Sequence, residues 1–167
     1  MTELSTRSNI SDSRILVLVH TREVARQLTK FLQNDAAIKQ AFHPRVLVGH
    51  GGYDGMSWFR EQSVALDAFR RGADLTDLEG GSDTLIGCRL LVATSVLEEG
   101  LDVAHCDLVV RLQGVQSLIG FIQSRGRARK QNSQMLVLAS ASEKHHLQRV
   151  RQQEGAMKLV VRQHANF

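Results

Sequence analysis

The sequence predicts an α/β fold in which helices cover both faces of a mainly parallel sheet. Two observations support this prediction: five short runs are rich in β-branched and other apolar residues, and the segments between them carry apolar residues at helical spacing. Strands that alternate with helices indicate βαβ units, whose crossover connections bury both faces of a parallel sheet. The chain has 167 residues, which is enough for one domain with a single core.

The predicted strands are short and largely apolar. The first, Arg14–His20, is apolar at nearly every inner position, as expected for a strand that is buried on both faces. The others are Arg45–Gly49, Leu90–Thr94, Leu108–Leu112 and Gln134–Ala139.

The predicted helices have one apolar face each. The first follows the first strand and places Val24, Leu28, Phe31 and Leu32 on the face expected to be buried. The second predicted helix is Ser57–Arg71, with Trp58, Ala65, Leu66 and Phe69 on one side. The third is Gln116–Ala128, with Leu118, Ile119 and Ile122 inward, and the last is Ser142–Glu154, with Ser142 as its N-cap.

These elements suggest three parts of the chain. Residues 1–13 are polar and are expected to form a flexible N-terminal segment, residues 14–141 form the domain, and residues 142–167 form a C-terminal helix and extension. Residues 72–88 are rich in Gly and Asp and lack periodicity, so we expect a surface loop there.

Composition excludes several classes of protein. No apolar run reaches the length of a membrane span, and the chain has no Cys/His spacing typical of a zinc site, so no membrane or metal role is expected. Cys88 and Cys106 are isolated, which favours reduced thiols in an intracellular protein. The net charge of +4 is compatible with a polyanionic partner but is too small to indicate one.

Polar residues follow three of the predicted strands. Thr21 and Arg22 follow the first strand, and His50 and Gly51 follow the second. Thr94 is the last residue of the third strand, and Ser95 comes after it. In parallel sheets, ligands bind at the carboxyl ends of the strands. We therefore expect these groups along one edge of the sheet, within reach of the arginine-rich end of the Gln116–Ala128 helix.

That helix end carries the densest group of cations in the chain, Arg125, Arg127 and Arg129, around Gly126. A guanidinium is always charged and forks onto phosphate oxygens, and glycine permits a close approach of the backbone. The residues alone leave two interpretations open: a phosphate-binding group, or a solvated basic helix end that favours its own helix dipole.

Three segments together resemble motifs IV, V and VI of superfamily 2 helicases: Ile15–Glu23, Leu91–Val103 and Gln116–Lys130. The string Gln-Ser-Arg-Gly-Arg-Ala-Arg is similar to motif VI of Dicer helicase domains and RIG-I-like receptors, and the tract 49–72 fits the same group. The resemblance covers about Arg14 to Ala139. It implies a RecA-like three-layer sandwich, the second lobe of an ATP-dependent RNA helicase or translocase.

The resemblance also implies roles for individual residues. Arg127 is the first candidate for an arginine finger on ATP, and Arg125 or Arg129 the second, because the Arg-Gly-Arg-x-Arg spacing departs from that of DEAD-box helicases. Gly100 and Asp102 are expected near the nucleotide. The residues expected to bind the RNA backbone are Thr21, Arg22, His50, Gly51, Gln62, Thr94 and Ser95. Structural alternatives remain for several of these: a strand-end cap for Thr94, the start of a solvated helix for Arg22, and packing or hydrogen bonding for His50. For Gln62, a role without nucleic-acid contact also stays open.

The chain lacks two motifs that nucleotide hydrolysis requires. It has neither a GxxxxGK[ST] loop for the phosphates nor a DExD/H tetrad for Mg²⁺. We therefore expect ATP with Mg²⁺ to be bound jointly with a first RecA-like lobe, and the isolated chain to be monomeric and inactive as an ATPase. The expected partner is RNA, double-stranded by resemblance, and the expected location is the cytoplasm rather than the nucleus.

Two other functions remain open. A DNA helicase lobe of the Hef/FANCM type shares the motif V string, although its motif VI usually differs from Ser124–Lys130. A non-catalytic module for docking RNA or protein is the second alternative.

Overall fold

The computed structural model describes residues 13–49, 55–72, 87–94, 106–112, 118–128 and 133–164. Its centre is a five-stranded sheet in the order β2-β3-β1-β4-β5, with every pair parallel. The strands are β1 (Ile15–Val19), β2 (Arg45–Leu47), β3 (Leu90–Thr94), β4 (Leu108–Leu112) and β5 (Gln134–Leu138). All five lie within the predicted runs, so the predicted α/β fold with a parallel sheet is confirmed.

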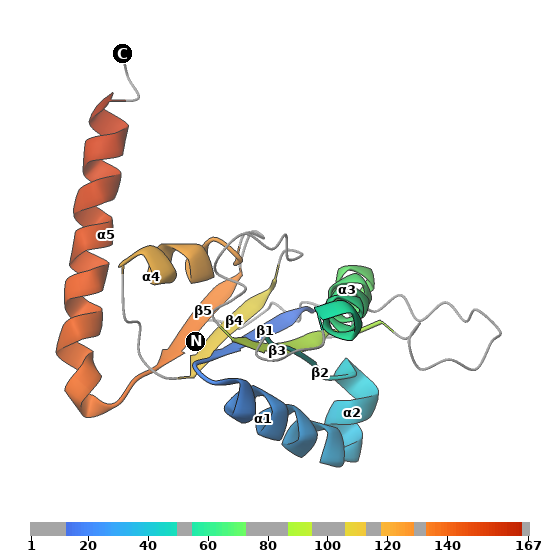
Figure 1. The fold of residues 1–167 in the computed structure, drawn as a ribbon. Helices are drawn as coiled ribbons and strands as arrows, with labels where there is room; N and C mark the ends of the chain where they lie inside the picture. Colours follow the sequence, from blue (N-terminus) through green and yellow to red (C-terminus); the bar gives the residue numbers. More distant parts are fainter. Residues whose placement is uncertain are drawn as a thin grey trace, which may run out of the picture.

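Helices lie on both sides of this sheet (Figure 1). They are α1 (Arg22–Asn34), α2 (Ala36–Phe42), α3 (Gly55–Arg71), α4 (Leu118–Arg125) and α5 (Lys144–His164), with a short 3-10 helix at Ala141–Glu143. Helix α2 has no counterpart among the predicted elements. It begins at its own N-cap, Asp35, and ends at His43, whose φ of 45° is left-handed.

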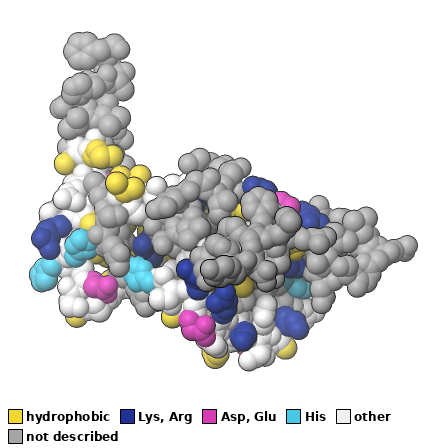
Figure 2. All heavy atoms as spheres, viewed as in Figure 1, with side chains coloured by type: hydrophobic (Ala, Val, Ile, Leu, Met, Phe, Trp, Pro, Cys, Tyr) yellow, Lys and Arg dark blue, Asp and Glu magenta, His cyan; other side chains and the backbone are white. Residues whose placement is uncertain are grey.

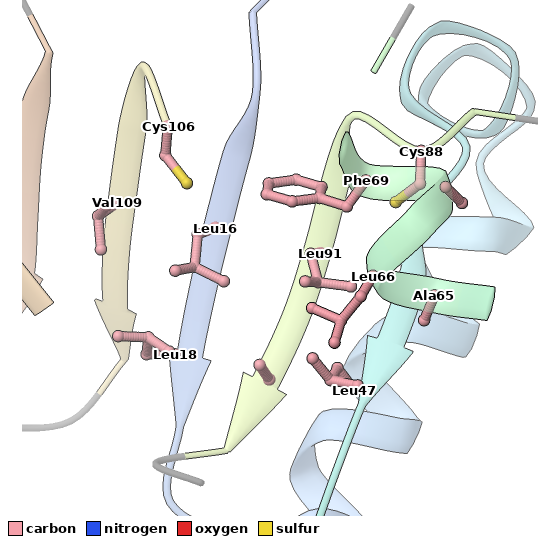
Figure 3. Packing of buried hydrophobic residues seen from close by; sticks show 12 residues of the cluster. Leu16, Leu18, Leu47, Ala65, Leu66, Phe69, Cys88, Leu91, Cys106 and Val109 are labelled. Carbon is pink, nitrogen blue, oxygen red and sulfur yellow. The ribbon is translucent and has the colours of Figure 1, made fainter. Parts of the chain in front are cut away.

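The alternation of side chains along β1 and β3 divides the core between the two faces. Leu16 and Leu91 point to the face covered by α3, where they pack with Phe69 (Figure 3). Val17 and Val92 point to the opposite face, where they pack with Ala25 of α1. A strand that is apolar at successive positions is therefore buried on both sides, as the sequence predicted.

Two predicted helix faces need correction. Phe31 is 72% exposed and Val24 is 40% exposed, because the stripe that α1 buries runs through Ala25 and Thr29. Leu28 and Leu32 do pack against the core, as predicted. Ile119 is 68% exposed, whereas Phe121, which was not predicted as inward, is 5% exposed. Apolar spacing alone leaves the rotation of a short helix ambiguous, and contact with the sheet decides it.

The ends of two predicted segments also differ. Cys88 is fully buried, and its N–H donates to the carbonyl of Ala68, so the predicted surface loop ends before this residue. The N-cap of the last helical segment is Ser140 rather than Ser142, and α5 continues to His164. Figure 1 shows that α5 runs beside α4 and that its last turns extend beyond the sheet. None of the helices among the described residues is long and apolar enough to span a membrane.

Gly72 ends α3 in a conformation that requires glycine. Its φ is 67°, and a Cβ there would lie 2.8 Å from Nε and Nη2 of Arg14. Arg14 in turn donates from Nη2 to the carbonyl of Arg70, at 2.9 Å. An arginine just before β1 therefore caps the carboxyl end of α3.

Candidate functional site

The predicted site residues fall at two opposite edges of the sheet. Thr21, Arg22 and Thr94 lie where β1 and β3 end, which we call the carboxyl edge. Arg125 and Arg127 lie near the start of β4, at the amino edge. Six predicted residues lie outside the described residues: His50, Gly51, Ser95, Gly100, Asp102 and Arg129.

Thr21 and Arg22 begin α1 at the carboxyl edge. The Thr21 hydroxyl accepts a hydrogen bond from the N–H of Val24, at 3.2 Å, so it caps the helix. The Arg22 side chain is exposed, and no hydrogen bond or ion pair engages it within the described part of the chain. Lys and Arg side chains are visible in the region of α1 (Figure 2). Of this pair, Arg22 is the residue with a side chain available to a ligand.

Thr94 ends β3 but does not face the surface. Its side chain is 4% exposed and points to the same face of the sheet as Val92, toward α1. Its hydroxyl has no hydrogen-bond partner among the described residues. A buried hydroxyl without a partner is costly, so within the described part of the chain the Thr94 hydroxyl is a hydrogen-bonding group that is not satisfied.

Gln62 is occupied by a contact inside the domain. It lies on α3, is 8% exposed, and donates from Nε2 to the carbonyl of Val48, at 3.1 Å. This contact ties α3 to the chain that follows β2. The sequence left open a role for Gln62 without nucleic-acid contact, but it did not predict this hydrogen bond.

The turn after α4 carries Arg127 and is fixed on both sides. The N–H of Arg127 donates to the carbonyl of Ser124, at 3.2 Å, and its carbonyl accepts from the N–H of Cys106, at 3.1 Å. Cys106 lies two residues before β4. The turn is therefore anchored to the amino edge of the sheet.

This position corrects one prediction. The arginine-rich end of the helix was expected to reach the edge that carries Thr94, and that expectation is wrong. Strands β4 and β5 pair in parallel, so the chain has to cross back from the carboxyl edge to the amino edge between them. Helix α4 makes this crossing, and its last residues and the following turn therefore bring Arg125 and Arg127 to the amino edge.

Arg125 forms an ion pair with α5. Its Nη1 lies 2.7 Å from each carboxylate oxygen of Glu154, whose side chain is 9% exposed, while that of Arg125 is 51% exposed. The pair borders a cavity of about 630 Å³ between α4, β5 and α5. The contact ties α4 to α5, and the guanidinium remains partly open to solvent.

A second arginine contact of α4 was not predicted from the sequence. Arg111 lies within β4, is 5% exposed, and donates from Nη1 to the Ser124 hydroxyl, at 2.6 Å. That hydroxyl donates to the carbonyl of Gly120, at 2.7 Å. The signal was present in the sequence: an arginine interrupts the otherwise apolar strand Leu108–Leu112.

The two cysteines are buried at the amino edge, and both are free thiols, as predicted. Figure 3 shows them on separate segments, Cys88 before β3 and Cys106 before β4. The pKa of the Cys88 thiol is raised to about 12, mainly because the thiol is buried. Such a thiol is protonated at neutral pH and is not a nucleophile.

Comparison with known proteins gives three kinds of match. Residues 1–132 match the family described as helicase conserved C-terminal domain. Dicer-like protein 1 of Phaeosphaeria nodorum is 38% identical over 141 residues, which cover 83% of this chain and 8% of that protein. Endoribonuclease Dicer homolog 2 of Arabidopsis thaliana is 39% identical over 84 residues, which cover 50% of this chain and 5% of that protein.

A solved structure supports the same fold. The C-terminal domain of the DEAD-box protein Dbp5 aligns with a TM-score of 0.60 at 18% identity, over 86% of this chain and 71% of that one. The chain therefore has the RecA-like fold of that domain. It spans less than a tenth of the length of the two Dicer proteins it matches.

Proposed function

The chain belongs to the helicase conserved C-terminal domain family, and from this premise we propose that it is the second lobe of an ATP-dependent RNA helicase or translocase of the Dicer or RIG-I-like type. In this proposal Arg127 serves ATP at the amino edge of the sheet, and residues at the carboxyl edge contact the RNA backbone. The similarity to Dicer proteins, one of which is named an endoribonuclease, supports RNA as the nucleic acid.

The observation that carries the proposal is the anchored turn of Arg127. Its backbone is bonded to Ser124 on one side and to Cys106 on the other, at the end of a helix that is tied to both the sheet and α5. An arginine that stabilises charge on a phosphoryl group must be positioned before the reaction begins. An exposed basic helix end that served only its own dipole would not need this support.

The first lobe would hold most of the nucleotide. ATP with Mg²⁺ supplies the phosphoryl group whose hydrolysis drives the cycle. In this chain, Arg127 would face the γ-phosphate, and Gly100 and Asp102 are proposed near the ribose. Of the three arginines around Gly126, Arg127 is the proposed finger because of its position in motif VI, and Arg125 is paired with Glu154.

RNA would bind at the opposite edge of the same sheet. Arg22 offers an exposed cation where β1 ends, and backbone contacts of this kind read the geometry of a duplex rather than its sequence. A strand of five residues spans roughly 16 Å. The two proposed ligands would thus be joined by rigid strands, so that closure of the lobes on ATP also changes the grip on RNA.

The test uses the helicase in which this lobe is joined to its first lobe. Arg127→Ala is expected to lower RNA-stimulated ATP hydrolysis by about a thousandfold or more, with little change in duplex RNA affinity. Arg149→Ala, which removes an exposed cation on α5, is the matched control and is expected to hydrolyse ATP normally. Normal turnover by Arg127→Ala would remove this residue from the finger role.

The nucleic-acid activator separates the remaining alternatives. Stronger stimulation by duplex RNA than by forked DNA supports the proposal, whereas the reverse order supports a DNA helicase of the Hef/FANCM type. RNA binding without stimulated hydrolysis would indicate a docking module. The isolated chain is expected to bind RNA weakly, in a salt-sensitive manner, and to lack ATPase activity; hydrolysis by residues 1–167 alone would contradict the proposed division of the site.

A further inference from the structure

Arg111 is a charged residue in the part of the sheet that α4 covers. It shares a face of β4 with Val109, which is fully buried, and only 5% of Arg111 is exposed. Removing a guanidinium from water costs several kcal/mol unless its hydrogen bonds are satisfied in the protein. A methionine would fill such a position without that cost. The presence of arginine therefore calls for a reason other than packing.

The contacts of Arg111 lead through one residue to the turn. Its Nη1 donates to the Ser124 hydroxyl at 2.6 Å, and the Ser124 carbonyl accepts from the N–H of Arg127 at 3.2 Å. Ser124 is 1% exposed, so neither contact competes with bulk water. Two hydrogen bonds and one buried serine connect β4 to the backbone of Arg127.

A second connection comes from the start of the same strand. The N–H of Cys106 donates to the carbonyl of Arg127, at 3.1 Å. Cys106 precedes β4 by two residues and Arg111 is its fourth residue, so the turn is held from both ends of one strand. Arg127 lies two residues beyond the end of α4, and its backbone is bonded to the helix at Ser124 and to the sheet at Cys106.

We infer that Arg111 is a positioning residue, which acts through Ser124 to hold the turn that carries Arg127 in register with β4. The inference rests on the proposed function of Arg127. Arg111 does not need to touch the turn itself, because its hydrogen bond to Ser124 reaches the turn through α4. A finger displaced by about 1 Å loses about a hundredfold in rate, so the contact would affect turnover more than binding.

Ser124→Ala is the primary test, because it removes one oxygen and leaves the strand intact. In the two-lobed helicase, kcat for RNA-stimulated ATP hydrolysis is expected to fall by about tenfold to a hundredfold, with KM for ATP and duplex RNA affinity within about twofold of wild type. Thr29→Val is the matched control. Thr29 is also buried and also donates its hydroxyl to the carbonyl four residues earlier, at 2.8 Å, but it lies on α1. This control is expected to keep the wild-type kcat.

Substitutions of Arg111 give a second readout. Arg111→Met removes the donor and keeps an apolar chain of similar length, and it is expected to lower kcat as Ser124→Ala does. Arg111→Lys can still donate one hydrogen bond and is expected to recover part of the loss. A purely structural role would lower the melting temperature without this order of kcat values.

Combination with Arg127→Ala separates the inference from the proposed function. If Arg111 and Ser124 act through Arg127, Ser124→Ala has no further effect on the residual kcat of Arg127→Ala. A wild-type kcat for Ser124→Ala, or an equal loss in both backgrounds, would overturn the positioning role and leave the finger intact. A wild-type kcat for Arg127→Ala would overturn the proposed function instead.

Hydrogen exchange tests the contact itself in residues 1–167. The Arg127 amide is expected to exchange at least about tenfold faster in Ser124→Ala than in wild type, with no change in Thr29→Val. Unchanged exchange in Ser124→Ala would contradict the inference, whatever the ATPase results.

Discussion

Helices α1 and α4 lie on opposite faces of one sheet, and they are attached to it by different kinds of contact. Helix α1 packs through Ala25 against Val17 and Val92, with an apolar stripe that continues to Leu28 and Leu32. Helix α4 also packs through one aromatic side chain, Phe121, but arginine contacts tie it to β4 and to α5. The apolar packing of α1 has no preferred direction, whereas the hydrogen bonds and ion pair of α4 do.

The proposed function accounts for the two kinds of attachment. Apolar packing stabilises a helix on a sheet but allows small shifts along it, because the contact has little angular preference. Hydrogen bonds of 2.6–2.7 Å from guanidinium groups fix both distance and direction. In the proposed function, α4 presents an arginine to a phosphate, and directional contacts of this kind would hold that arginine in place.

Removal of apolar packing beneath α1 is expected to have the largest effect on stability. Val92 is fully buried, and Val92→Ala is expected to lower the free energy of unfolding by about 2–3 kcal/mol, through lost burial and a residual cavity. Urea denaturation followed by circular dichroism measures this. A loss below that of Ser124→Ala would mean that directional contacts, not apolar packing, dominate the stability of the domain.

Loss of the contact between α4 and α5 is expected to have a smaller effect. Glu154→Gln removes the carboxylate that pairs with Arg125 and is expected to cost about 1–2 kcal/mol, because one partner is buried and the other is half exposed and can be rehydrated. Asp67→Asn, which breaks an exposed pair with Arg70, is the control and is expected to cost less than about 0.5 kcal/mol. Equal costs for the two variants in urea denaturation would show that burial of Glu154 does not strengthen its pair.

The proposed RNA contact at the start of α1 is expected to affect how strongly the affinity for duplex RNA depends on salt concentration. Arg22→Ala is expected to reduce the slope of log affinity against log salt for duplex RNA by about one, since one phosphate contact is lost. Arg149→Ala removes an exposed cation from α5 and serves as control, with no change in slope expected. Fluorescence anisotropy at several salt concentrations measures both, and identical slopes for Arg22→Ala and wild type would place the RNA elsewhere.

A pH-dependent effect is expected beneath α3, where the Cys88 thiol is buried. The pKa of its thiol rises from 9.0 to about 12 in the folded protein, so folding favours the protonated form. The resulting stabilisation is complete below pH 9 and is lost as the pH rises from 9 to 12. The stability difference between wild type and Cys88→Ala should therefore shrink over that interval; a difference independent of pH would contradict the raised pKa.

Much of the fold could be predicted from local patterns. The five strands were recognised because short runs of successive apolar residues are typical of strands in a parallel sheet, a property that each run carries by itself. Burial on both faces holds for β1 and β3, whereas Leu136 and Leu138 of the edge strand β5 are 48% and 50% exposed. Helix α2 was missed because its seven residues, Ala36–Phe42, are too short for a periodic apolar pattern and depend on the cap at Asp35.

The candidate site could be predicted only in part. The arginines around Gly126 stand out in the sequence because charge is dense there, and Arg22 because it follows a buried strand. The burial of Thr94 and the occupation of Gln62 by Val48 could not be predicted, since they depend on how α1 and α3 pack.

The order of apolar and polar residues by itself determined the parallel α/β architecture and the segments that bear chemistry, because burial of a strand and amphipathicity of a helix are local properties of the chain. Tertiary structure alone decided which edge of the sheet receives Arg127, and which side chains hold it there. Those outcomes depend on the direction in which α4 crosses the sheet. They also depend on contacts between residues that are distant in the sequence: Arg111 and Ser124 are 13 residues apart, and Arg125 and Glu154 are 29 residues apart. Contacts of that kind form only when the folded chain brings distant residues together.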